Sequence, residues 1–186
     1  MTCFLVLAHQ VKYAEDAGYS AVLAVSAFAF YGVATLLGQS SAWMSDRIGR
    51  EKAMVLCCAS ALVGLLALIA IRDTSHPWLL YIYALGFGYA GGLFSATIFA
   101  GAADIFHGKQ FGTASGMILT GMGLGGAIGP WLGGYLYDTT GSYDIAFILC
   151  LVCIVLSSVS FWIAAPRNAD KLRDGWLKSQ IEKSSI

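Results

Sequence analysis

The chain has 186 residues, of which 58% are apolar and only 12% are charged, and 22 are glycine. Soluble domains have about a quarter charged residues, so this composition excludes an ordinary water-soluble domain. The 11 basic side chains balance the 11 acidic ones, and a net charge of zero provides no field that would attract nucleic acid.

The first apolar stretch, MTCFLVLAHQV at residues 1–11, has about half of the ~20 residues that a membrane-crossing helix needs. We interpret it as part of a membrane helix. A signal peptide would begin with basic residues and end at a small-residue cleavage site, whereas this stretch runs into Lys12, Glu15 and Asp16.

Five uncharged stretches follow, and each can cross a hydrocarbon core of about 30 Å at about 1.5 Å per helical residue. They cover about residues 20–42, 53–71, 78–102, 113–137 and 145–165. The sequence therefore predicts an all-α membrane protein, a helical transmembrane bundle over residues 1–165, with a cytoplasmic tail at 166–186.

The distribution of Lys and Arg predicts the orientation, because cytoplasmic segments carry an excess of both. On one side lie Arg47, Arg50, Lys52, Lys109, Arg167, Lys171, Arg173, Lys178 and Lys183. Only Lys12 and Arg72 lie on the other side. We expect an integral protein of the plasma membrane with a cytoplasmic C-terminus and with segment 12–19 outside.

Small residues recur every four positions in three of the predicted spans. Helices in lipid associate through close backbone approach, which such a stripe permits. The stripes are Gly38 and Ala42; Gly88, Gly92, Ala96 and Ala100; and Gly121, Gly125, Gly129 and Gly133. We therefore predict tight helix packing along these faces.

Pro130 lies inside the glycine-rich span 113–137 and has no amide hydrogen, so the carbonyl of Gly126 loses its helical partner. A bend is expected there. With Gly125, Gly126 and Gly129 nearby, the bend is either a flexing hinge or a fixed kink.

The segment AWMSDRIGREK at residues 42–52 is a short cytoplasmic reversal between two predicted spans. Gly49 allows the chain to turn, and Asp46 can pair with Arg47 or Arg50. The spacing resembles the loop signature G-x-x-x-D-R-x-G-R-R/K of the major facilitator superfamily. Four positions match, Ala42 replaces the first glycine, and Glu51 replaces a basic residue before Lys52.

Three further segments resemble the second half of monocarboxylate-type and oxalate/formate-type members of that superfamily. They are HQVKYAEDAGYS at 9–20, GFGYAGGLFSA at 86–96 and GMGLGGAIGPWLGGYLYDTTGSYDIAF at 121–147. The resemblance implies the C-terminal six-helix half of a twelve-helix secondary transporter, with its first helix shortened and its N-terminal half as partner. It also implies that Ala42, Asp46, Arg47, Gly49, Arg50 and Lys52 form a latch that opens and closes during transport.

The implied activity is secondary active transport of a small metabolite, an organic anion such as a monocarboxylate, by alternating access. Uniport, symport and exchange with protons or another ion are all open. The alternative is a non-transporting membrane protein that acts as an assembly or regulatory partner.

Candidates for the substrate pathway are few, because the five full spans contain no acidic or basic side chain and Asp104 and Asp144 lie at span ends. His9 is suited to proton coupling and lies three residues before Lys12. The alternative is an ordinary polar interface residue, which is the more common role of a lone histidine near a helix end. The other candidates, for which a lipid-facing position is the alternative, are Ser26, Phe30, Tyr83, Phe87 and Thr120.

No enzyme, metal site or cofactor is expected. The spans contain no paired carboxylates or His cluster, and the chain has no phosphate-binding glycine loop. The five cysteines are Cys3, Cys57, Cys58, Cys150 and Cys153. Although the last two have C-x-x-C spacing, they lie in an apolar run without further ligands, so we interpret them as small buried hydrophobes.

Overall fold

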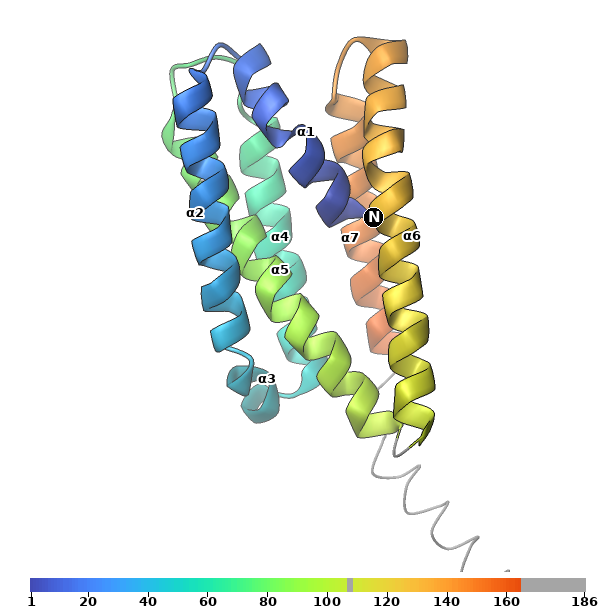
Figure 1. Ribbon diagram of the computed structural model, residues 1–186. Coiled ribbons are helices and arrows are strands. Elements are labelled where there is room, and N and C mark those ends of the chain that lie inside the picture. Colours follow the sequence, from blue (N-terminus) through green and yellow to red (C-terminus); the bar gives the residue numbers. More distant parts are fainter. Residues whose placement is uncertain (107–108, 165–186) are drawn as a thin grey trace, which may run out of the picture.

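The computed structural model describes residues 1–106 and 109–164, so the predicted tail at 166–186 lies outside the described residues (Figure 1). The described part is helical. Its helices are α1 (Thr2–Asp16), α2 (Ala21–Ser40), α3 (Trp43–Ile48), α4 (Arg50–Ile69), α5 (Trp78–Ile105), α6 (Lys109–Thr140) and α7 (Asp144–Ala164).

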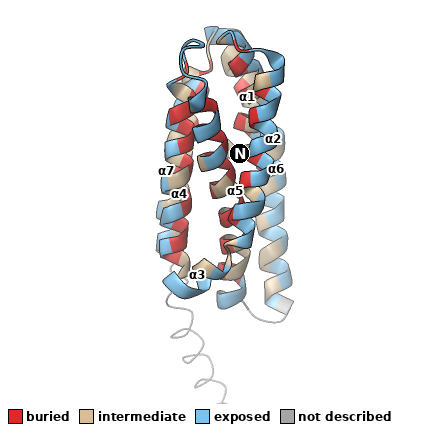
Figure 2. Ribbon diagram, turned by 90° about the vertical axis from the view of Figure 1, so that its left-hand side faces the viewer, coloured by how far each residue is buried: buried red, intermediate tan, exposed pale blue. Residues whose placement is uncertain are grey.

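The helices α2, α4, α5, α6 and α7 are long and apolar enough to cross a membrane. This confirms the predicted class, an all-α membrane bundle. Exposed residues lie mainly on the outer parts of the helices, and buried residues lie mainly toward the interior of the bundle (Figure 2). Large exposed apolar side chains include Val22, Leu36, Met117, Trp131 and Ile163. Lipid is the solvent that such a surface requires.

The helix α1 is longer than the apolar stretch that predicted it. It continues through a charged turn to Asp16, where Lys12 Nζ lies 2.5 Å from an Asp16 carboxylate oxygen one turn later. Lys12 therefore marks the end of the apolar stretch but not the end of the helix. The i,i+4 ion pair between Lys12 and Asp16 stabilises the helix beyond that point.

The helix α5 packs closely against both α2 and α4, and these three helices form the α2–α4–α5 group. The helix α7 packs against α4, and α6 packs mainly against α1. In Figure 1, α1 crosses obliquely between these groups, and its N-terminus lies midway along the bundle. The helix α1 is thus the main partner of α6, which makes smaller contacts with α5 and α7.

Glycines bring α5 into backbone contact with both of its neighbours. A Cβ atom at Gly92 would overlap the carbonyl oxygen of Thr35 on α2, and one at Gly38 would overlap the carbonyl oxygen of Tyr89 on α5. On the α4 side, a Cβ at Gly64 would lie 2.6 Å from the amide nitrogen of Phe87. No side chain fits at these three positions, so the packing depends on glycine.

We predict that Gly92→Ala destabilises the bundle, whereas Gly32→Ala does not. The first methyl group collides with the backbone of α2 and should cost about 1–3 kcal/mol through overpacking. A Cβ at Gly32, also in a membrane helix, has no described atom within 4 Å, so this change should be neutral or stabilising by up to about 1 kcal/mol. Unfolding of the purified chain in detergent measures both, and equal stability of the two variants would contradict the packing argument.

Candidate functional site

A tight reversal joins α2 to α4 at one end of the bundle. Ala42 immediately precedes the short helix α3, and Gly49 separates α3 from α4 with a φ of +94°. Residues with a side chain rarely adopt this backbone conformation, so glycine is required where one helix ends and the next begins.

Arg50, on α4, occupies the centre of this end and contacts two further elements, α3 and α5. Its Nη1 lies 2.5 Å from Asp46 Oδ1 and donates to Ser45 Oγ at 3.0 Å, and its Nε donates to Asp104 Oδ2 at 2.7 Å. The Arg50 side chain is 17% exposed, so water screens these interactions less than at an open surface. Arg50 therefore ties the reversal to the last turn of α5.

Asp104 is a member of this cluster that the sequence analysis did not assign to it. It lies 54 residues beyond Arg50 in the chain, and only the packing of α4 against α5 brings the two together. The sequence did contain one indication of this pairing. Asp104 is a carboxylate at the end of a predicted span, on the same side of the membrane as the basic loop.

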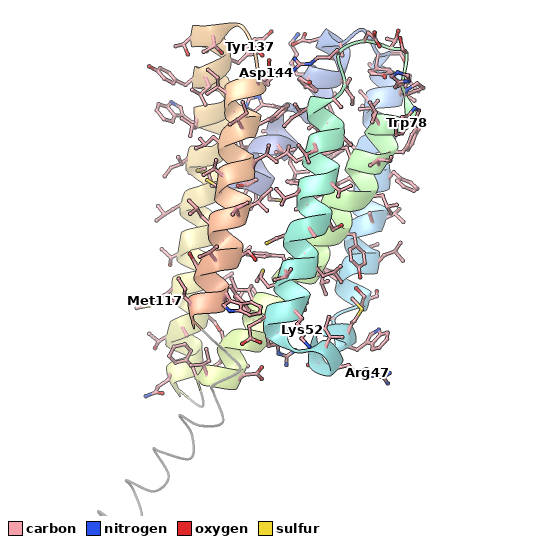
Figure 3. All side chains as sticks on the ribbon, turned by 180° about the vertical axis from the view of Figure 1, so that it is seen from behind. Arg47, Lys52, Trp78, Met117, Tyr137 and Asp144 are labelled. Atoms are coloured by element: carbon pink, nitrogen blue, oxygen red, sulfur yellow. The ribbon has the colours of Figure 1, made fainter. Side chains whose placement is uncertain are left out.

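Arg47 and Lys52 lie at the same end of the bundle but do not join this cluster (Figure 3). The guanidinium carbon of Arg47 lies 4.9 Å from the centre of the Trp43 ring, which is a cation–π contact. Within residues 1–106 and 109–164, neither basic residue forms an ion pair, and both are exposed. The three basic residues of the predicted latch thus divide into one held inward, Arg50, and two exposed ones, Arg47 and Lys52.

The glycine stripe of α6 packs against α1 over two turns. A Cβ at Gly125 would overlap the backbone of Met1, and one at Gly129 would lie 2.7 Å from the Met1 carbonyl oxygen and 3.2 Å from the Leu5 amide nitrogen. Gly121 does not take part, because no described atom lies within 4 Å of its Cβ position. The glycine stripe of α6 therefore contacts α1 over only part of its length.

His9 fills the space that Gly133 leaves open. A Cβ at Gly133 would lie 2.7 Å and 2.8 Å from two atoms of the His9 ring, and His9 Nε2 lies 2.9 Å from the carbonyl oxygen of Pro130. Since a carbonyl only accepts, Nε2 carries the proton of this bond. The His9 ring thus connects α1 to α6 at Pro130. The helix α6 continues through Pro130 without interruption.

The other pathway candidates fall into separate places. Ser26 Oγ lies 3.4 Å from Tyr81 Oη, and the Phe30 ring meets the Tyr81 ring edge-on at 5.9 Å, all on the exposed side of α2 and α5. Tyr81 is a member of this group that the sequence analysis missed. Its signal was weak, because tyrosine near a span end is common in any membrane protein.

Tyr83 and Phe87 are buried, so neither faces lipid. Their rings stack at 5.8 Å, and Tyr83 Oη donates to Gln10 Oε1 at 2.6 Å, which links α5 to α1. Thr120 is exposed and donates to the Gly116 carbonyl of its own helix at 2.9 Å. The structure therefore does not bring the five predicted residues into one site.

Comparison with known proteins identifies one family. The family model of the Major Facilitator Superfamily matches residues 1–181. Monocarboxylate transporter 12 of Rattus norvegicus is 30% identical over 160 residues, which are 84% of this chain and 33% of the relative. Monocarboxylate transporter 11 of Homo sapiens is 27% identical over 175 residues, 88% of this chain and 36% of the relative. The chain spans about a third of the length of these curated relatives.

We predict that Gly133→Ala weakens the α1–α6 contact and that Gly134→Ala does not. The first methyl group displaces the His9 ring and breaks its bond to Pro130, at a cost of about 1–3 kcal/mol. A Cβ at Gly134 makes only an ordinary contact of 3.8 Å with the same ring. Unfolding in detergent tests this difference. In a His9→Ala background the effect of Gly133→Ala should largely disappear, and an undiminished effect there would contradict the assignment.

Proposed function

Since the chain belongs to the Major Facilitator Superfamily, we propose that it forms the C-terminal half of a secondary transporter. The substrate would be a small organic anion such as a monocarboxylate, moved by alternating access. Two halves that rock about a central site are needed for this mechanism, so an N-terminal half would supply the other wall.

The observation that carries the proposal is the position of Arg50 between Asp46 and Asp104. These contacts fix the reversal on the end of α5 and leave Arg47 directed outward. Asp46 is also 63% exposed, although it pairs with Arg50. In our proposal, Arg50 positions the reversal, while Asp46 and Arg47 meet the other half when the transporter faces outward and leave it when the transporter faces inward.

The substrate pathway would run along α1, α2 and α5. The helix α2 contains no acidic or basic side chain, so this part of the chain would meet the uncharged portion of a substrate. Ser26, Phe30 and Tyr81 provide hydroxyl groups and aromatic faces for such contacts. The carboxylate, and a coupled proton or other ion, would then be bound chiefly by the other half, because a charge is costly in lipid without a partner.

We further propose that the end bearing α3 faces the cytoplasm. Arg47 and Lys52 lie there, at the end opposite Asp144 and Tyr137 (Figure 3). Arg72 pairs with Asp144, and Lys12 pairs with Asp16, which accepts a hydrogen bond from Tyr137. An epitope inserted after Ile48 should be protected in intact cells, and one inserted after Ser75 should be accessible. The reverse pattern would contradict the orientation without affecting the family assignment.

We predict that Arg50→Ala and Asp104→Asn each lower the uptake rate of a labelled monocarboxylate, measured with the full-length transporter in cells. Loss of a charge-assisted contact of about 1.5 kcal/mol corresponds to about a tenfold decrease, and partial exposure of Asp104 makes the effect smaller for that variant. Glu15→Gln is the control for loss of a charge, because Glu15 is exposed, lies outside the predicted latch and forms no ion pair among the described residues.

The exchanged pair Arg50→Asp with Asp104→Arg should recover part of the lost rate. Unchanged uptake in both single variants would overturn the role of this cluster. Absence of any uptake by the unaltered transporter, at normal surface abundance, would instead overturn transport itself and favour the non-transporting alternative.

A further inference from the structure

A hydrogen bond in the interior of the bundle joins α1 to α5. Tyr83 Oη on α5 donates to Gln10 Oε1 on α1 at 2.6 Å. Gln10 is 4% exposed and Tyr83 is 1% exposed, so water does not compete for this bond. The same burial keeps Tyr83, a predicted pathway residue, away from a substrate. The pair therefore calls for a role other than substrate binding.

Gln10 divides its amide group between two helices. Its Nε2 donates to the Leu7 carbonyl of α1 at 3.4 Å, while its Oε1 accepts from Tyr83. An amide side chain is costly to bury in an apolar interior unless a partner satisfies it. In membranes, polar side chains of this kind link neighbouring helices. The amide oxygen of Gln10 thus serves the contact with α5 rather than the helix to which it belongs.

Neighbouring helices hold Tyr83 in place. Its ring stacks on the Phe87 ring with the centroids 5.8 Å apart, and the Phe87 ring lies 6.4 Å from the Tyr31 ring of α2. On the α4 side, a Cβ at Gly64 would lie 3.1 Å from the Tyr83 carbonyl oxygen. The α2–α4–α5 group therefore presents the tyrosine hydroxyl to α1 from a fixed position.

The helix α1 is attached to this group differently from the way its members are attached to one another. The backbone of α5 contacts α2 and α4 at Gly38, Gly92 and Gly64. In contrast, α1 packs mainly against α6 and approaches α5 closely at few points. A hydrogen bond between side chains can break and form again without altering the packing inside the α2–α4–α5 group. Movement of α1 away from α5 therefore leaves that group intact.

We propose that Gln10 and Tyr83 are positioning residues for transport, whose hydrogen bond holds α1 against α5 in the described conformation and releases α1 in the opposite one. This inference rests on the proposed function, because α1 and α5 both border the proposed substrate pathway. Neither residue touches the substrate. The hydrogen bond instead sets the relative populations of the two conformations, since it stabilises one of them alone.

The first test compares Tyr83→Phe, Gln10→Met and the combination of both in the full-length transporter. Each single variant leaves one buried polar group without its partner, so it should unfold in detergent at a lower temperature. The double variant leaves neither group unpaired, and its unfolding temperature should return close to that of the unaltered transporter. Its KM for a labelled monocarboxylate should nevertheless stay changed by about threefold or more, as expected for loss of a hydrogen bond between membrane helices.

A purely structural pair would give a different result. In that case the double variant would recover both the unfolding temperature and KM, and this outcome would overturn the proposal. Tyr135→Phe is the matched control, because Tyr135 is exposed on α6 and lies outside the pair. It should change neither the unfolding temperature nor KM.

The second test measures the distance between α1 and α5 and does not require uptake. Spin labels at Glu15 of α1 and Leu85 of α5, both exposed, report this distance in the full-length transporter after replacement of the native cysteines. In the double variant, the population with a longer distance should rise by about threefold or more. Labels at Val22 of α2 and Leu85 should show no change, because backbone contacts hold α2 to α5.

The two tests separate failure of this proposal from failure of the proposed function. An unchanged α1–α5 distance in the double variant would overturn the role of the hydrogen bond, whether or not uptake occurs. A longer distance in a transporter that moves no monocarboxylate would support the hold of the pair on α1 and count against the proposed function alone.

Discussion

Contact between helix backbones at glycine positions is the constraint on which this structure depends. Lipid is as apolar as the side chains of these helices, so burying those side chains between helices stabilises the bundle little. Close packing of one helix backbone against another therefore has to supply the attraction. Gly38 and Gly92 allow α2 and α5 to touch, and Gly64 does the same for α4 and α5. The α2–α4–α5 group that results places Arg50 next to Asp104.

Polar interactions stabilise the ends of the bundle rather than its middle. At one end, Arg50 joins three elements, and at the other, Arg72 Nη1 lies 3.1 Å and 3.2 Å from the two carboxylate oxygens of Asp144. Water is available at both ends, so charges there avoid the cost of burial in hydrocarbon. Among residues 1–106 and 109–164, the hydrogen bonds in the middle of the bundle are neutral, such as that of Tyr83 to Gln10.

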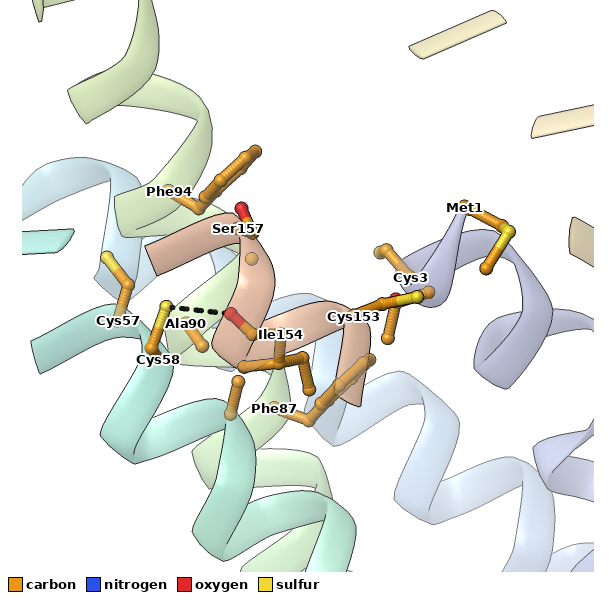
Figure 4. Close-up of a pocket in the computed structure, with 13 residues that line it drawn as sticks. Met1, Cys3, Cys57, Cys58, Phe87, Ala90, Phe94, Cys153, Ile154 and Ser157 are labelled. Atoms are coloured by element: carbon orange, nitrogen blue, oxygen red, sulfur yellow. Dashed lines mark hydrogen bonds between the residues drawn. The ribbon is translucent and has the colours of Figure 1, made fainter. Parts of the chain in front are cut away.

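The class of fold could be predicted from the sequence because long apolar runs and four-residue glycine spacing are local signals. The reversal around Gly49 could also be located, since its residues are contiguous. The partner of Arg50 could not, because Asp104 is brought near only by helix packing. Spacing alone also could not distinguish Gly121, which faces open space, from Gly133, which receives a histidine ring. Cys3, Cys57, Cys58 and Cys153 line one cavity (Figure 4), and this grouping is likewise a property of the assembled helices.

The oblique path of α1 has a consequence for how this protein can change in evolution. The helix α6 meets the rest of the described bundle mainly through α1, where His9 occupies the place of a missing side chain at Gly133. A larger residue at position 133 is compatible only with a smaller one at position 9. Homologous sequences should therefore vary at these two positions together, with their combined side-chain volume nearly constant.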